Sequence, residues 1–135
     1  MSTKKIKSVR KFLNYLEQAE AGPVRLDMLS NNIKYDWLAA QAVPVKRSLV
    51  GRSEVESYLS ILPYTYQILE ADELVVDTAG EKVLALGGER ARLLRTEEVI
   101  SANWNAVFDF SGDLISRIVV SIYRWTILST MKTAT

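Results

Sequence analysis

The stretch EVISANWNAVFDFSGDLISRIVVSIYRWTIL, residues 98–128, decides the fold predicted for this chain. Across residues 100–110 apolar side chains alternate with mostly polar ones, and Trp104 belongs to the apolar set. Strict alternation over this length is typical of a β-strand with one dry face. A turn at residues 111–113 leads into a second strand that is β-branched and aromatic. We therefore expect a long hairpin.

The second strand of this hairpin is apolar on both faces at residues 118–120. A strand that is dry on both faces is usually covered on both sides. In a short chain, helices can cover one side and a second copy of the chain the other. Tyr123 and Trp125 share the outer phase of the strand, and aromatic residues are enriched at interfaces. We therefore expect a homodimer with Tyr123 and Trp125 in its interface.

The composition indicates one globular domain over residues 1–135. The chain is 48% hydrophobic and 24% charged, which is ordinary for a protein with a buried core. Its net charge of +1 offers no electrostatic reason to expect a nucleic-acid or membrane partner. No apolar run approaches the roughly 18 residues that span a bilayer, and no apolar segment follows the charged N-terminus as in a secretory signal. A cytoplasmic protein is expected.

The chain contains neither cysteine nor histidine. Without them it can form no disulfide, thiolate nucleophile or Ser-His-Asp triad, and almost every zinc site is excluded. We expect no metal and no cofactor. Any acid–base chemistry must use Asp, Glu, Tyr, Lys or Arg.

Three helices are predicted before the main run of strands. An amphipathic helix covers residues 4–21. A short helix follows the break at Gly22-Pro23, with its apolar residues within 24–29 and its end at Asn31-Asn32. Ser53 and Glu56 have the spacing of a capping box for a third helix. That helix should turn five side chains inward: Val55, Tyr58, Leu59, Ile61 and Leu62.

Strands are predicted at residues 33–38, 65–77 and 82–94, ahead of the hairpin. Gly87-Gly88 inside the third of these suggests a β-bulge that bends the sheet. Helices first and antiparallel strands afterwards favour an α+β fold, with the helices on one face of a strongly curved sheet. The space between them is a cone, and a cone is a natural pocket.

The order of these elements resembles the NTF2-like superfamily, which includes ketosteroid isomerase and the SnoaL-like polyketide cyclases. The resemblance covers about residues 5–128 and includes VGRSEVESYL at residues 50–59 and FDFSGDLI at residues 108–115. It implies a cone-shaped α+β fold on an antiparallel or mixed sheet, a pocket inside the cone, and a homodimer through the outer sheet face.

The resemblance carries over to the catalytic residues only in part. Tyr15 lies seven residues before Gly22, as the catalytic tyrosine of ketosteroid isomerase lies before its helix-ending glycine. Asp36 lies near the position of the general base, although the closest register places Trp37 there. Tyr15 and Asp36 are thus the candidate catalytic residues.

The third catalytic group of that family, an acid that holds the oxyanion, would fall at Trp104 or Ala106 in this chain. Neither can act as a carboxylic acid, so steroid isomerisation is not expected. The expected pocket lining consists of five residues: Trp37, Tyr58, Arg92, Trp104 and Ala106. Arg92 would contact an anion if it points inward, or lie on an exposed sheet face if it does not.

Two functions remain open from the sequence. One is a homodimer whose cone binds a small, mostly apolar organic molecule, unless Trp37 and Trp104 fill the cone themselves. The other is an enzyme of the SnoaL or ketosteroid isomerase type, performing proton transfer, cyclisation or hydration with Asp36 and Tyr15.

Overall fold

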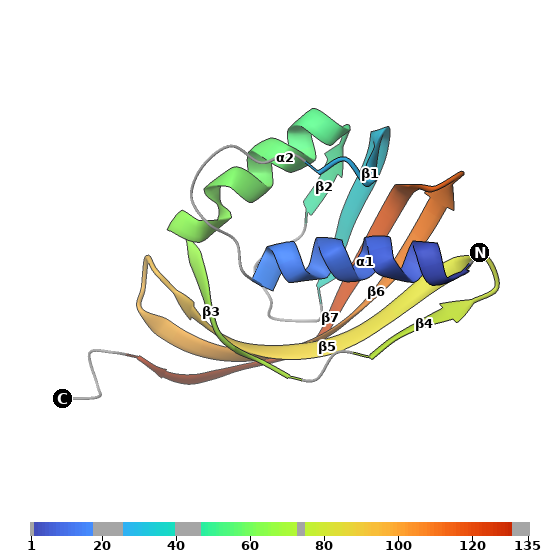
Figure 1. Ribbon diagram of the computed structural model, residues 1–135. Helices are drawn as coiled ribbons and strands as arrows, with labels where there is room; N and C mark the ends of the chain where they lie inside the picture. Colours follow the sequence, from blue (N-terminus) through green and yellow to red (C-terminus); the bar gives the residue numbers. More distant parts are fainter. Residues whose placement is uncertain (1, 18–25, 40–46, 73–74, 131–135) are drawn as a thin grey trace.

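The computed structural model describes residues 2–17, 26–39, 47–72 and 75–130 (Figure 1). Two α-helices, a short 3-10 helix and seven strands lie within these ranges. In chain order they are α1 (Ser2–Glu17), β1 (Leu29–Ala39), β2 (Arg47–Val50), α2 (Arg52–Ile61), η1 (Leu62–Tyr64), β3 (Tyr66–Ala71), β4 (Val75–Ala79), β5 (Lys82–Leu93), β6 (Glu98–Ser111) and β7 (Leu114–Thr130).

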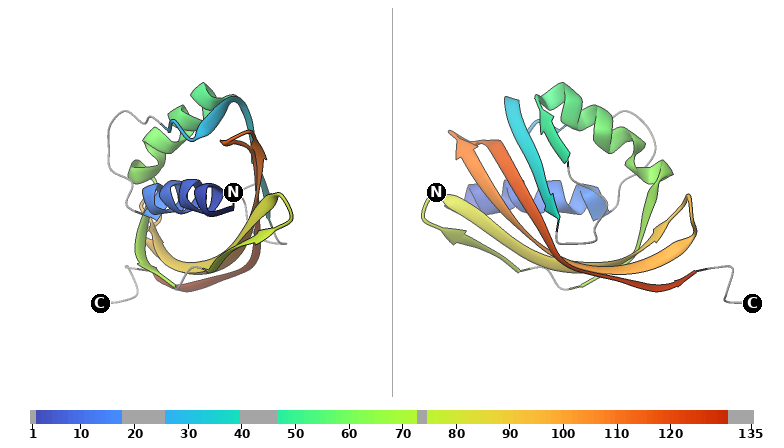
Figure 2. Two further views of the ribbon diagram at one scale, coloured as in Figure 1. Left: turned by 45° about the vertical axis from the view of Figure 1, so that its right-hand side comes forward. Right: turned by 180° about the vertical axis from the view of Figure 1, so that it is seen from behind.

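The strands form one mixed sheet with the order β2-β1-β7-β6-β5-β3, and β4 also pairs with β5. The β1–β7 pair is parallel and the other pairs are antiparallel. The sheet curls strongly, and α1 lies inside the curve with α2 above it (Figure 2). The predicted α+β fold, with helices on the concave face of a curved mixed sheet, is confirmed.

The predicted hairpin is β6 and β7. Along β6 the side chains of Ile100, Ala106 and Phe108 are buried, whereas the alternate positions are half-buried. The register between β6 and β7 shifts at three places, each leaving one residue of β7 without a partner: Ser116, Tyr123 and Leu128. An extra residue on one strand bends the strand and increases its twist, so these shifts help to curve the sheet.

The core lies between α1 and the concave face of the sheet. Val9 and Phe12 of α1 are almost completely buried against it. The rings of Phe12 and Phe108 meet edge to face with their centroids 6.1 Å apart, a favourable aromatic geometry. This contact joins α1 to the centre of β6.

The predicted helix over residues 24–29 is wrong where the structure describes it. Residues 27–28 form a turn, and Leu29 already begins β1. The Ile115 N–H donates to the Met28 carbonyl at 2.8 Å, and Leu29 pairs with Ile115. Pairing with β7 therefore overrides the local helical pattern, as tertiary context often does. Residues 24–25, like residues 18–21 of the first predicted helix, lie outside the described ranges.

The predicted capping box of α2 is also wrong. The helix begins two residues earlier than expected, with Gly51 at φ 97° as its N-cap and no side-chain cap. The Glu56 carboxylate instead accepts hydrogen bonds from the Leu26 backbone N–H at 2.7 Å and from Arg52 Nε at 3.0 Å. Glu56 thus ties α2 to the start of β1. Ile61, predicted to point inward, is 54% exposed.

The strand predicted over residues 65–77 is two strands, β3 and β4, which both pair with β5. The bulge predicted at Gly87-Gly88 is wrong, because the β5–β6 register runs through both glycines without a shift. The two glycines lie where β5 changes partner from β4 to β3, and the Asp72 N–H donates to the Gly88 carbonyl at 2.9 Å. Strand β2 was not predicted. Among the described helices, none combines the length and the apolar character that a membrane span requires.

Candidate functional site

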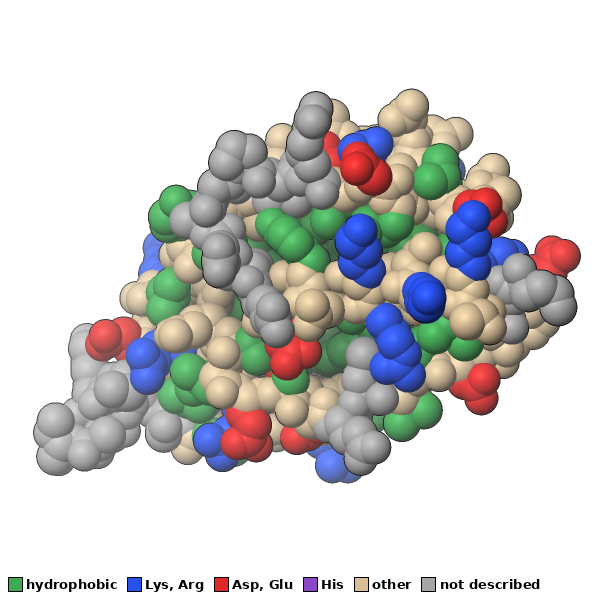
Figure 3. All heavy atoms as spheres, viewed as in Figure 1, with side chains coloured by type: hydrophobic (Ala, Val, Ile, Leu, Met, Phe, Trp, Pro, Cys, Tyr) green, Lys and Arg blue, Asp and Glu red, His purple; other side chains and the backbone are tan. Residues whose placement is uncertain are grey.

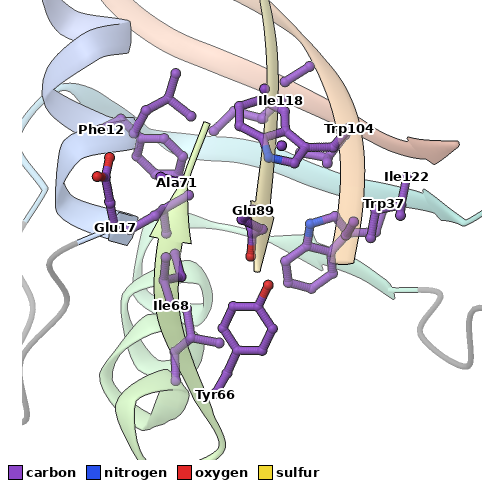
Figure 4. A pocket seen from close by; sticks show the side chains of 18 of the residues that line it. Phe12, Glu17, Trp37, Tyr66, Ile68, Ala71, Glu89, Trp104, Ile118 and Ile122 are labelled. Carbon is purple, nitrogen blue, oxygen red and sulfur yellow. The ribbon is translucent and has the colours of Figure 1, made fainter. Parts of the chain in front are cut away.

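A cavity of about 250 Å³ lies between the helices and the concave face of the sheet. Its wall draws on α1, α2 and most of the strands, and most of its lining side chains are apolar or aromatic (Figure 4). In the space-filling view, hydrophobic side chains show in the hollows between the helices and the sheet, while basic side chains gather over α1 (Figure 3). An apolar cavity with few polar groups is typical of small-molecule sites.

Aromatic rings form a continuous wall along one side of this cavity. Trp37 lies between Tyr35 and Tyr58, with ring centroids 4.7 Å and 4.8 Å away. Phe12 continues the row, 6.0 Å from Tyr35. Strand alternation explains the arrangement, because Tyr35 and Trp37 are two residues apart on β1 and therefore share a face.

Glu89 of β5 is a half-buried carboxyl group in the cavity wall. Burial raises its pKa to about 7, the negative charge of Glu17 acts in the same direction, and a hydrogen bond from the Trp104 indole lowers it. The hydroxyl group of Tyr66 points toward this carboxyl group (Figure 4). A carboxyl group with this pKa is present in both charge states near neutral pH, which suits it to bind a charge or to transfer a proton.

The mouth of the cavity is acidic. Glu17 of α1 and Asp72, which follows β3, line it and are exposed, as is Ala71 beside them. No Lys or Arg among the described residues lines the cavity. The charged residues that line the cavity in the described part of the chain are therefore all acidic.

The two candidate catalytic residues do not line the cavity. Asp36 accepts hydrogen bonds from Ser48 Oγ and, at 3.3 Å, from the Arg117 guanidinium. Its neighbour Trp37 faces the cavity, so strand alternation turns Asp36 to the other face of the sheet. Tyr15 packs against the edge of the core, and burial raises the pKa of its phenol. The structure does not bring Asp36 and Tyr15 together.

Four of the residues expected in the pocket wall do line this cavity, namely Trp37, Tyr58, Trp104 and Ala106. Arg92 does not. It follows the fully buried Ala91 on β5 and lies on the opposite face of that strand from Glu89. Its Nε atom is buried without a hydrogen-bond partner in the described part of the chain.

Glu89, Tyr35 and Tyr66 line the cavity although the sequence reasoning did not single them out. A signal existed for Glu89, because it shares the strand phase of the buried residues Val83 and Ala85. A lone carboxyl group in the apolar phase of a strand is an ionisable group facing the core. The β-bulge expected at Gly87-Gly88 hid this phase relationship, because a bulge between Ala85 and Glu89 would shift the alternation by one residue.

At the expected dimer interface, Tyr123 is 56% exposed. The register pairs Trp125 with Ala102, and the side chain of Trp125 lies outside the described part of the structure. Among the described residues, no three acidic side chains gather closely enough to hold a metal ion.

The arrangement of helices and sheet matches solved structures closely, although no family model and no curated protein matches the sequence. An NTF2-like protein from Burkholderia xenovorans LB400 superposes with a TM-score of 0.71 at 15% identity, covering 89% of each chain. A hypothetical protein with a ketosteroid isomerase-like fold from Catenulispora acidiphila, in complex with trimethylamine, gives 0.69 at 9% identity, covering 93% of this chain and 86% of that one.

An LEH-like epoxide hydrolase from M. tuberculosis gives a TM-score of 0.64 at 15% identity, covering 89% of this chain and 83% of that one. These likenesses agree on one architecture. The chain has the NTF2-like fold, to which the ketosteroid isomerase-like and polyketide cyclase-like proteins also belong.

Proposed function

We propose that this protein binds a small, mostly apolar organic molecule in the cavity between its helices and its sheet. The observation that carries the proposal is the cavity itself, which remains about 250 Å³ in size although Trp37 and Trp104 both line it. Ligand sites are usually concave, preformed and apolar, with a few convergent polar groups. The neighbour from Catenulispora acidiphila was solved in complex with a small organic molecule, trimethylamine.

A thermal-shift screen of small apolar and aromatic compounds tests this proposal. A compound that binds the folded state raises the midpoint of unfolding. Ala71→Trp should abolish that shift, because Ala71 is exposed at the mouth of the cavity and a large ring there obstructs it. Ala79→Trp is the matched control, since Ala79 is an exposed alanine on β4 that does not line the cavity. Equal shifts in both variants would contradict the proposal.

Proton transfer on a bound carbonyl compound is a second candidate function, and Glu89 favours it. Among the described carboxyl groups that line the cavity, only that of Glu89 is half-buried, and its pKa of about 7 suits a general acid or base. Asp36 and Tyr15 are poor candidates for this chemistry because neither lines the cavity. Deuterium incorporation next to the carbonyl group of bound ketones, measured by NMR, should disappear in Glu89→Gln and persist in Asp36→Asn.

A second copy of the chain is the partner we propose for the outer face of the sheet. Large apolar side chains lie exposed there: Leu84 at 40%, Leu86 at 49% and Val75, which pairs with Leu86, at 55%. Exposed apolar patches on soluble proteins commonly mark such interfaces. Light scattering should then give twice the 15.2 kDa monomer mass at micromolar concentration.

Leu86→Asp should dissociate this dimer. Ile61→Asp is the matched control, because Ile61 is 54% exposed on α2, away from the outer sheet face. A wild-type mass equal to the monomer mass would remove the dimer from the proposal.

A further inference from the structure

The charged groups that line the cavity are all acidic in the described part of the chain. They are Glu17 at the mouth and Glu89 deeper in the wall. Asp72 lies at the rim, with its carboxylate turned to the Gly88 side of β5. The basic side chains closest to Glu89 along β5 do not offset them. Arg90 is exposed and lies 4.0 Å from Glu70, and Arg92 lies on the other face of the strand. The cavity is therefore a site of negative potential enclosed by apolar walls, which strengthen electrostatic interactions.

Five aromatic rings from four elements surround the Glu89 side of the cavity. They belong to Tyr35 of β1, Trp37 of β1, Tyr58 of α2, Tyr66 of β3 and Trp104 of β6. The face of an aromatic ring carries partial negative charge and attracts cations, with tryptophan the strongest. The centroid distances of 4.7 Å and 4.8 Å around Trp37 leave no gap in the wall between Tyr35 and Tyr58.

We infer that the cavity takes an organic cation, a ligand with a tertiary or quaternary ammonium group held between these aromatic rings and the Glu89 carboxylate. The inference rests on the proposed ligand-binding function and specifies the class of ligand. An anionic ligand would pass Glu17 and meet a second negative charge at Glu89. A neutral ligand would leave the ionised Glu89 without a counter-charge in an apolar wall, which is costly.

Binding of such a cation depends on pH through Glu89. The titratable groups on the cavity side of Glu89 are Glu17 from α1 and the phenols of Tyr35, Tyr58 and Tyr66. The Asp72 carboxylate lies where a side chain of Gly88 would be, on the opposite face of β5. Burial raises the pKa of Tyr35 above its ordinary value, so its phenol stays neutral through the neutral range. Because a bound cation favours the ionised carboxylate, the affinity should rise as Glu89 ionises, up to a pH of about 7.

Three probes of one shape and different charge test the inference. Choline supplies the cation. The neutral control is 3,3-dimethyl-1-butanol, in which a carbon atom replaces the nitrogen of choline. The anion is 3,3-dimethylbutanoate, a carboxylate that carries the same tert-butyl group. Affinities are measured by calorimetry and by NMR shifts of the tryptophan indole N–H groups. At about pH 8 choline should bind about tenfold more tightly than the neutral analogue, and the anion should bind most weakly.

Two variants connect the preference to Glu89. Glu89→Gln should reduce the preference for choline to about threefold, leaving the contribution of the rings, and should remove its pH dependence. Glu70→Gln, an exposed carboxylate on β3 that does not line the cavity, should change neither. Circular dichroism checks that both variants are folded, and the neutral analogue provides an internal measure of an intact cavity.

The outcomes separate this inference from the proposed function. If the neutral analogue binds as tightly as choline in the wild-type protein, the cation inference is overturned and the apolar ligand site stands. A preference for choline that survives unchanged in Glu89→Gln would overturn the role of the carboxylate. If none of the probes binds, the inference falls, and the compound screen with Ala71→Trp decides separately whether the cavity is a ligand site.

Discussion

Gly87 on β5 lies directly beneath the indole ring of Trp104 on β6. A Cβ atom placed on Gly87 would come within 2.6 Å of Cζ2 of that ring and 3.0 Å of Cε2. The two residues are register partners, so their side-chain positions share one face of the sheet. The absence of a side chain at Gly87 therefore allows Trp104 to lie over the strand, line the cavity and reach Glu89.

Gly87→Ala should destabilise the protein by about 1–3 kcal/mol, because the added methyl group must displace a large ring from a packed wall. Gly88→Ala is the matched comparison. Its Cβ would meet Asp72 Oδ2 at 2.6 Å and Asn103 Nδ2 at 2.7 Å, and both are the ends of side chains that can rotate away. Chemical denaturation should give the larger loss for Gly87→Ala, with a shifted tryptophan emission. Equal losses of stability in the two variants would mean that the Trp104 ring can move aside at little energetic cost.

The stability of the protein should fall as the pH rises toward 7. Glu89 has a pKa of about 7 in the folded protein, against an ordinary value of 4.5. Between these values the folded state keeps a proton that the unfolded chain has released, so the stability is full below 4.5 and declines through about 7. The full loss is on the order of 3 kcal/mol at most, since one pKa unit corresponds to about 1.4 kcal/mol.

Glu89→Gln should remove this decline. We expect the variant and the wild type to unfold at similar denaturant concentrations near pH 4, and the variant to be the more stable near pH 8. Glu81→Gln, in the exposed turn between β4 and β5, is the matched control and should follow the wild type. A wild-type curve that rises over this range would show that Glu89 is stabilised in its charged form.

Phe108→Ala should cost about 3–5 kcal/mol, because it removes a fully buried ring and leaves a void in the core. The same ring supports Phe12 of α1, so the docking of that helix should weaken as well. Tyr64→Ala, at an aromatic position that is 66% exposed, should change the stability by about 0.5 kcal/mol or less. Urea denaturation of both variants measures the difference, and comparable losses would contradict the assigned core.

Asp36→Asn should have little effect on stability or on ligand binding. The Asp36 carboxylate lies 3.3 Å from the Arg117 guanidinium, whose side chain is 52% exposed, and an ion pair open to solvent contributes about 1 kcal/mol or less. Because Asp36 does not line the cavity, a cavity ligand should bind the variant and the wild type equally. A tenfold loss of affinity in Asp36→Asn would place it in the site after all.

The hairpin and the fold class could be predicted from the sequence, because both depend on hydrophobic patterns along the chain. The alternation from Ile100 to Phe110 identifies the dry face of β6, and that face is the one that packs on α1. The turn between β6 and β7 is predicted at residues 111–113, where this alternation stops. Local patterns failed where a distant strand competes with them, as at Leu29, which pairs with Ile115 of β7 instead of forming a helix.

The candidate site depended on the tertiary structure for a different reason. The sequence alone determined which chemistry the chain can perform, since it lacks histidine and cysteine, and it determined the long hairpin that shapes the concave face. Which carboxylate faces the cavity was decided by strand phase and register. A shift of one residue sends a side chain to the opposite face, so Asp36 lies outside and Glu89 inside. Burial then raises the pKa of Glu89, and burial is a property of the folded chain.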